Sequence, residues 1–149
     1  GKEDERKSIL RLIAEYNPFL LDVEFNTIQK DKKLASYLKK SKCKLLISWH
    51  DFKKTPNESQ LKSRFNKMRK FSNVVKIVTV AKNVSDASRL LSLYSIKSKN
   101  KTVAFCMGDQ GKFSRILCLH LGSPFTYVSL GKAIAPGQFS VDEIKSLEN

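Results

Sequence analysis

No run of apolar residues in the chain approaches the ~20 that a membrane-spanning helix needs, and the charged N-terminus lacks the apolar core of a signal peptide. The chain also has no Gly-x-Gly-x-x-Gly run opening a helix after a strand, and no Walker-type phosphate loop. These absences argue against a membrane protein and against the nucleotide-binding branch of α/β folds. The 149 residues, 41% hydrophobic and 28% charged, are those of one globular domain that is long enough to bury a core.

Cysteine is scarce as well. Cys43, Cys106 and Cys118 make an odd count and form no Cys-x-x-Cys pair, and two of them lie inside apolar runs. This usage favours reduced, buried thiols in a cytoplasmic protein over disulfides or a zinc site. Cys118 and His120 are two residues apart, which is a poor spacing for a helical metal pair. The sequence therefore predicts no metal site.

Acidic residues are few: there are 14, against 28 lysines and arginines, which leaves a net charge of +14. A charge of this size points to an anionic partner, either nucleic acid or a small carboxylate drawn in by the field. The lysines are nevertheless spread along the chain and are not interleaved with aromatic residues as in single-strand binders. We therefore favour a diffuse basic surface over a nucleic-acid site, and we keep a nucleic-acid binder as an alternative class.

The residues that are present alternate between helical and strand-like patterns without a break. Expected helices cover residues 4–16, 27–40, 57–69, a segment capped by Ser85, about 112–121 and a segment capped by Ser140, and expected strands cover 19–25, 44–50, 73–80, 102–107 and 124–130. Six helices alternating with five strands are the pattern of a parallel sheet with helical crossovers.

The stretch from Asn73 to Val80 is the most unusual of these strands. Its β-branched residues predict a strand buried on both faces, yet Lys76 lies in its middle. A buried ammonium has to pair, or to give up its proton and act as a nucleophilic amine. The alternative is that Lys76 lies at the sheet edge and extends its amine to water while its stem covers apolar surface. Residues 73–80 alone leave both interpretations open.

Candidate site residues gather at the carboxyl ends of the expected strands, where α/β folds place their active sites. They are Asp22 and Glu24 of the first strand, His50 at the end of the second, Lys76 of the third, Met107 at the end of the fourth with Arg115 after it, and Gln138 after the fifth. An amine, an imidazole, a guanidinium and an amide at one edge suit a substrate with a carboxylate and a carbonyl. Each polar candidate also has a structural explanation: a loop hydrogen bond for His50, surface exposure for Arg115 and a loop cap for Gln138. Asp22 and Glu24 could instead pair with lysines outside the site.

Four motifs carry a resemblance to a known family. They are the segment Ser48–Pro56 (SWHDFKKTP), Val75-Lys76-Ile77, Met107-Gly108 through Gly111-Lys112-Phe113-Ser114-Arg115, and Lys132–Val141 (KAIAPGQFSV). Their order and spacing, over essentially the whole chain, resemble the type I 3-dehydroquinate dehydratases. The resemblance implies an α/β fold of the parallel (β/α)8 or TIM-barrel type. Residues 1–149 would form one partial barrel domain and supply about five strands and six helices.

The resemblance also implies an activity. The family consists of hydro-lyases that convert 3-dehydroquinate to 3-dehydroshikimate and water in the shikimate pathway of aromatic amino acid biosynthesis, through a lysine Schiff base and without metal or cofactor. By match to the motifs, Lys76 would form the Schiff base and His50 would be the general acid and base. The substrate-binding residues would be Arg115 for the carboxylate, Gln138 on the closing loop, Phe52 and Met107 lining the pocket, and Asp22 near the reacting groups.

Two features depart from the family pattern. Ile134 stands where the family usually has a serine that hydrogen-bonds the substrate, and losing a contact worth about 0.5–1.5 kcal/mol predicts weaker binding with unchanged chemistry. The family barrel also has eight strands, and this chain begins where the third has ended. The three missing strands would carry further substrate-binding arginines and a glutamate that works with the histidine. We therefore expect an N-terminal barrel segment to be missing from this sequence or supplied by another polypeptide, because an open arc of five strands would expose two edges and the apolar interior.

The sequence leaves three classes of function open. The leading class is the dehydratase acting on the small molecule 3-dehydroquinate. The second is a catalytically impaired fragment or a non-catalytic, anion-binding module on the same scaffold, and the third is the nucleic-acid binder. Turnover measured on this chain separates the first two, and oligonucleotide binding at low salt tests the third. The sequence does not decide whether the chain forms a homodimer.

Overall fold

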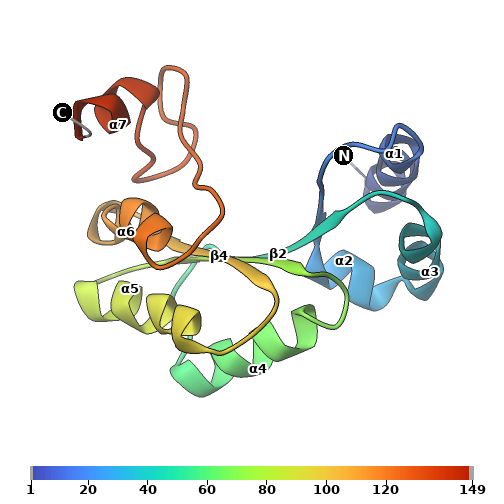
Figure 1. Ribbon diagram of the computed structural model, residues 1–149, viewed down its shortest axis with the longest axis horizontal. Helices are drawn as coiled ribbons and strands as arrows, with labels where there is room; N and C mark the ends of the chain where they lie inside the picture. The colour runs from blue at the N-terminus through green and yellow to red at the C-terminus, as the bar shows by residue number, and fades with distance from the viewer. Residues whose placement is uncertain (1, 148–149) are drawn as a thin grey trace.

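A four-stranded parallel sheet forms the centre of the protein in a computed structural model that describes residues 2–147 (Figure 1). Its strands are β1 (Leu21–Glu24), β2 (Leu45–Asp51), β3 (Val74–Val80) and β4 (Lys101–Met107). They lie side by side in chain order, and each pairs in parallel with the next. Parallel neighbours need a crossover connection, and helices provide each one, as the alternation in the sequence predicts.

Seven α-helices and two short 3-10 helices occur within residues 2–147. They are α1 (Glu3–Glu15), α2 (Phe25–Lys30), α3 (Lys32–Lys40), α4 (Glu58–Met68), α5 (Val84–Leu91), α6 (Ser114–His120) and α7 (Val141–Leu147), with η1 (Ser92–Ser95) and η2 (Asp109–Gly111). In Figure 1, α4 and α5 lie against one face of the sheet, while α1 and α7 stand at opposite ends of the view. No helix in the described range is long and apolar enough to cross a membrane.

Side-chain caps decide where several helices begin. The single helix expected over 27–40 is wrong, because Asp31 adopts an extended conformation and its carboxylate caps a second helix, α3. This break gives seven α-helices where the sequence predicts six. Asn57 caps α4 as predicted, with its side chain accepting a hydrogen bond from a first-turn amide. The cap of α5 is Asn83 rather than Ser85, since it is the Asn83 side chain that accepts from the first turn.

Both faces of β3 are buried, as its run of β-branched residues predicts. Val75 and Ile77 point into the main core, which includes the apolar faces of α4 and α5. Val78 lies in a second cluster, which Met107 of β4 shares. Because side chains alternate along a strand, Lys76 points to the same face as Val78. The amine of Lys76 therefore lies on the face of the sheet opposite the main core.

The fifth strand expected over 124–130 is wrong, because the structure has a single isolated bridge there, between Ser129 and Ser140. The outer edge of β4 explains the difference. The Tyr94 hydroxyl accepts a hydrogen bond from the Ala104 amide (2.7 Å) and donates one to the Ala104 carbonyl (3.2 Å). A fifth strand would have to hydrogen-bond to these two backbone groups of Ala104, and Tyr94 already occupies both. Residues 124–130 therefore cannot pair with β4 at this point.

Candidate active site

Lys76 lies in the middle of β3, in register with Ser48 of β2 and Val103 of β4. Its side chain is 8% exposed, and Nζ donates a hydrogen bond of 2.6 Å to Oδ2 of Asp22 on β1. The interpretation in which the amine extends to water is therefore wrong. The amine has lost most of its water and keeps one carboxylate partner. The buried charge of Lys76 is therefore compensated by a direct ion pair.

Tyr127 lies beside the same amine. Lys76 Nζ is 3.4 Å from the Tyr127 hydroxyl and 4.6 Å from the centroid of its ring. The Tyr127 ring contacts the ring of Phe105 on β4, with 5.9 Å between centroids, and the guanidinium of Arg115 lies 4.6 Å from the Phe105 centroid. Two aromatic rings thus connect the amine of Lys76 to the cation of Arg115.

Arg115 stands at the start of α6 and is 2% exposed, so the surface interpretation of this residue is wrong. Ser114 anchors the start of the helix, since its hydroxyl donates to the Gly111 carbonyl (2.6 Å) and accepts from the Cys106 amide (2.8 Å). Burial lowers the pKa of the Arg115 guanidinium. One terminal nitrogen donates to the Pro136 carbonyl (3.4 Å), while Nε is buried without a hydrogen-bond partner among the described residues. A buried cation with an unused donor is suited to bind an anion.

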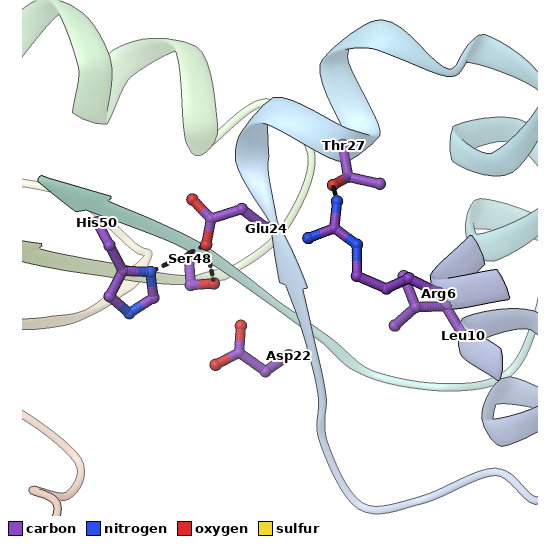
Figure 2. Close-up of a pocket in the computed structure, with 7 residues that line it drawn as sticks. All are labelled: Arg6, Leu10, Asp22, Glu24, Thr27, Ser48 and His50. Carbon is purple, nitrogen blue, oxygen red and sulfur yellow. Dashed lines mark hydrogen bonds and ion pairs between the residues drawn. The ribbon is translucent and has the colours of Figure 1, made fainter. Parts of the chain in front are cut away.

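Figure 2 shows a second polar cluster, at the carboxyl ends of β1 and β2. His50 Nδ1 is 2.9 Å from Glu24 Oε2, and the Ser48 hydroxyl donates to the same oxygen (3.2 Å). Because an ionised carboxylate only accepts hydrogen bonds, Nδ1 carries the hydrogen of this contact, and in the neutral ring Nε2 then holds the lone pair. The cluster lines an open cleft of about 260 Å³, whose walls also include Asp22 and, from α1, Arg6. Nε2 of His50 is thus the ring nitrogen that can accept a proton.

The loop of residues 132–139 contacts Arg115 through the Pro136 carbonyl. Within the loop, Gln138 Oε1 accepts hydrogen bonds from the amides of Ile134 (3.0 Å) and the residue that follows it (3.2 Å). The loop-cap interpretation of Gln138 therefore holds for its oxygen. Its amide nitrogen donates to no partner within residues 2–147 and stays available as a donor. Ile134, in the position of the expected serine, is 91% exposed.

The two apolar candidates differ in burial. Phe52 is 74% exposed, and its ring stacks on that of His50, with centroids 5.7 Å apart and an interplanar angle of 10°. Met107 is 6% exposed and packs in the apolar cluster that contains Phe105. Phe52 thus lies beside the imidazole, and Met107 belongs to the apolar layer beneath the site. Across residues 2–147, no three His, Cys, Asp or Glu side chains are grouped so that they could hold a metal ion.

Glu24 lies in the site, as its position two residues after Asp22 on the first strand predicts, although the motifs gave it no role. Two further residues contact the site that the sequence did not single out: Ser48 and Tyr127. Ser48 had a usable signal, because it lies two residues before His50 and so faces the same way on a strand. Tyr127 had none, because its segment forms no strand and its position beside Lys76 depends on the path of the chain.

The sequence matches a family model described as type I 3-dehydroquinase over residues 1–148. Curated relatives named 3-dehydroquinate dehydratase include those of Pyrobaculum aerophilum (42% identical over 95% of this chain), Dehalococcoides mccartyi (37% over 97%) and Methanocaldococcus jannaschii (33% over 99%). The chain spans 46%, 65% and 67% of the lengths of these relatives, respectively.

Solved structures with a similar fold include the type I 3-dehydroquinate dehydratase of Clostridium difficile with covalently modified comenic acid. That protein is 26% identical with a TM-score of 0.85, over 99% of this chain and 61% of that one. The 3-dehydroquinate dehydratase of Aquifex aeolicus is 29% identical with a TM-score of 0.81, over 97% and 65%. That of Geobacillus kaustophilus, at 20% identity and a TM-score of 0.87 over 99% and 59%, supports the fold alone.

Proposed function

The chain belongs to the type I 3-dehydroquinase family, and from this premise we propose that it carries the Schiff-base site of a 3-dehydroquinate dehydratase. This hydro-lyase converts 3-dehydroquinate to 3-dehydroshikimate and water. The observation that carries the proposal is the amine of Lys76, buried beside Asp22 and linked through two aromatic rings to the guanidinium of Arg115, whose Nε has no partner within residues 2–147. An amine and an anion site on one apolar face match a substrate with a ketone and a carboxylate.

Lys76 forms the covalent bond in this proposal. Its protonated amine gives one proton to Asp22 at 2.6 Å, and the lone pair of Nζ then attacks the ketone carbon of the substrate. The new C–N bond replaces the C–O π bond, and the oxygen leaves as water. The resulting iminium is an electron sink, so the carbon next to it becomes acidic.

His50 moves the proton that this acidity releases. Glu24 holds the Nδ1 hydrogen at 2.9 Å, which leaves the Nε2 lone pair to take the proton from the carbon next to the iminium. The electrons of the broken C–H bond form an enamine, which expels the hydroxyl group one carbon further along. His50 returns its proton to that hydroxyl, so water leaves and the imidazole is neutral again. Water then hydrolyses the product iminium and frees Lys76.

The other candidates bind and enclose the substrate. Arg115 receives the carboxylate, because its buried guanidinium has an unused donor. The free amide nitrogen of Gln138 supplies a contact from the loop of residues 132–139. Phe52, stacked on His50, and Met107 exclude water from the reacting groups.

Further strands complete this site in the proposal. Within residues 2–147, β1 is an edge strand that pairs with β2 alone, and apolar side chains near it are exposed: Leu12 at 58%, Tyr16 at 80% and Phe19 at 85%. Strands added at the β1 edge would cover this surface and close a TIM barrel of which residues 1–149 are one partial domain. They come from a longer polypeptide or from a second one. A second copy of this chain is the competing occupant, and the molecular mass in solution separates a homodimer from that arrangement.

Borohydride trapping tests the proposed function. The chain is incubated with 3-dehydroquinate and sodium borohydride, which reduces a lysine imine to a stable amine, and the adduct is located by peptide mass spectrometry. The same experiment is run on the chain with the N-terminal part of the Methanocaldococcus jannaschii relative fused ahead of Gly1. We expect an adduct on Lys76 that Lys76→Met abolishes and Lys70→Met, outside the site, leaves intact. Absence of the adduct from the fused protein would overturn the proposal.

Turnover measured in parallel separates the dehydratase from a binding module. Release of 3-dehydroshikimate by the fused protein supports the enzyme. An adduct without turnover in the fused protein, or binding without an adduct, would instead indicate a catalytically impaired module.

A further inference from the structure

We infer that Tyr127 is a catalytic residue of this site, whose hydroxyl relays a proton from Nζ of Lys76 to the substrate oxygen while the Schiff base forms. The inference rests on the proposed function, and it adds a second proton carrier, beside Asp22, to the step in which the Schiff base forms. It is independent of the motifs, because the segment that contains Tyr127 forms no strand and belongs to none of them.

The position of the phenol carries the inference. Nζ of Lys76 donates to the Tyr127 hydroxyl at 3.4 Å and lies 4.6 Å from the ring centroid, so ring and hydroxyl both contact the reacting nitrogen. Phe105, at 5.9 Å, and Phe125, at 5.7 Å, pack against the ring and set its orientation. Aromatic contacts of this kind are directional, so they favour one placement of the hydroxyl.

The hydroxyl of Tyr127 is also free to donate. Its oxygen accepts from Lys76, and within residues 2–147 its own hydrogen has no acceptor. When Nζ attacks the substrate carbonyl, Nζ and the substrate oxygen are bonded to the same carbon. The oxygen would therefore lie close to Nζ and within reach of the Tyr127 hydroxyl hydrogen. The phenol can therefore contact the nitrogen that loses a proton and the oxygen that gains one.

The other two proton carriers of the site are placed for different transfers. Asp22, at 2.6 Å from Nζ, has already taken the first ammonium proton and is not a base for a second one. His50 is fixed by Glu24 at 2.9 Å, and it pairs in register with Val78, two residues beyond Lys76 on β3. The imidazole is thus placed for the carbon next to the iminium, and the phenol for the iminium nitrogen itself.

The relay balances as follows. Attack of the Nζ lone pair forms the C–N bond and moves the carbonyl π electrons to oxygen, which leaves a positive nitrogen and a negative oxygen. Tyr127 gives its hydroxyl proton to that oxygen while it takes one proton from Nζ, so the phenol ends as it began and a neutral carbinolamine results. Protonated Asp22 then returns its proton to the carbinolamine hydroxyl. The C–O bond breaks, water leaves, and the nitrogen lone pair forms the iminium.

Tyr127→Phe isolates the relay, because it keeps the ring, its packing against Phe105 and its contact with Lys76, and removes the hydroxyl alone. The rate at which the borohydride-trapped adduct of Lys76 accumulates is measured by intact mass, on the chain and on the fused protein described above. We expect the variant to form the adduct about 100-fold more slowly, since positioned proton transfer is typically worth ~10²–10⁴-fold. Tyr16→Phe, at a tyrosine that is 80% exposed, is the matched control and keeps the wild-type rate.

Each outcome decides a different claim. Slow trapping in Tyr127→Phe with a normal rate in Tyr16→Phe supports the relay. Wild-type trapping by Tyr127→Phe overturns the relay and leaves the proposed function intact. Absence of any adduct in the wild-type fused protein overturns the proposed function, and the relay with it.

Discussion

At the residue scale, the site combines two buried cationic side chains, of which Lys76 is paired with a carboxylate and Arg115 is not. Lys76 is buried but paired with Asp22 at 2.6 Å, so its charge is compensated and its proton has an acceptor. Arg115 is buried, its Nε has no hydrogen-bond partner in the described part of the chain, and burial lowers the pKa of its guanidinium. The free protein therefore carries an electrostatic cost at Arg115 that an anionic ligand would relieve.

Replacing Arg115 should separate stability from binding. In Arg115→Met the chain keeps a long side chain over Phe105 and loses an uncompensated buried charge, so we expect the free energy of unfolding to stay equal or to rise. In the fused protein KM for 3-dehydroquinate should rise about 10- to 100-fold, because a charge-assisted hydrogen bond contributes about 1.5–3 kcal/mol. Urea unfolding and steady-state kinetics measure the two effects. Arg69→Met, outside the site, is the control, and a large loss of stability in Arg115→Met would contradict the account.

Glu24 should act on catalysis through the imidazole of His50. Glu24→Gln keeps a hydrogen-bond acceptor but loses the negative charge that stabilises the imidazolium form, so we expect kcat of the fused protein to fall about tenfold with KM nearly unchanged. In Glu24→Ala the His50 ring should also lose the contact that holds the hydrogen on Nδ1.

Nitrogen NMR of the His50 ring provides a direct check on the chain itself. The sequence has two histidines, so His120→Gln assigns the signals. The wild-type chain should show the hydrogen on Nδ1, and Glu24→Ala should show a mixture. A wild-type ring with its hydrogen on Nε2 would refute the proposed role of Glu24.

At the scale of elements, the loop of residues 132–139 is docked by backbone contacts. The Gly108 amide donates to the Pro136 carbonyl (3.2 Å), the same oxygen that accepts from Arg115. Gly137 has φ +69°, and a Cβ atom on it would lie 2.7 Å from the Gly108 carbonyl oxygen. The loop thus reaches the anion-binding arginine through a backbone approach that tolerates no side chain at Gly137.

Gly137→Ala should therefore release the loop. The new Cβ would meet backbone, and a positive φ costs a non-glycine residue roughly 1–2 kcal/mol. We expect faster proteolysis within residues 132–139 and a higher KM in the fused protein, while the cores on both faces of β3 stay folded. Gly131→Ala is the matched control, since its Cβ would meet no atom within 4 Å. Equal behaviour of the two variants would rule out the docking contact.

At the scale of the whole molecule, the protein has an α/β fold in which one face of the parallel sheet packs on the main core and the other carries the amine of Lys76. Val75 and Ile77 point into the large core beneath α4 and α5, and Lys76 points to the opposite face. The three cysteines are buried with free thiols, although only Cys106 and Cys118 lie in apolar runs.

These buried groups predict a loss of stability at alkaline pH. Burial raises the pKa of Cys106 and Cys118 above the ordinary 9.0, and it raises that of Tyr94 to about 12. Because the unfolded chain ionises first, their contribution is complete below pH 9 and is lost as the pH rises through the raised values. Urea unfolding near neutral pH and above pH 9 should show this decline, and Cys118→Ala should reduce it. A stability that is flat across that range would contradict the burial of these groups.

The sequence by itself determined the family, the alternation of helix and strand, and the candidates Lys76, His50 and Arg115. Those signals are local, because β-branched runs, caps such as Asn57 and short motifs can each be recognised from residues that are close together in the sequence. Two predictions were wrong: the unbroken helix across Asp31 and the strand over residues 124–130. A helix cap within a helical pattern and the pairing of an edge strand both depend on which other groups compete for the same backbone hydrogen bonds. The pairings of Lys76 with Asp22, of His50 with Glu24, and of Lys76 with Tyr127 link residues 26 to 54 positions apart. Only the tertiary structure decided these contacts, because the register of parallel strands and the path of the last loop set them.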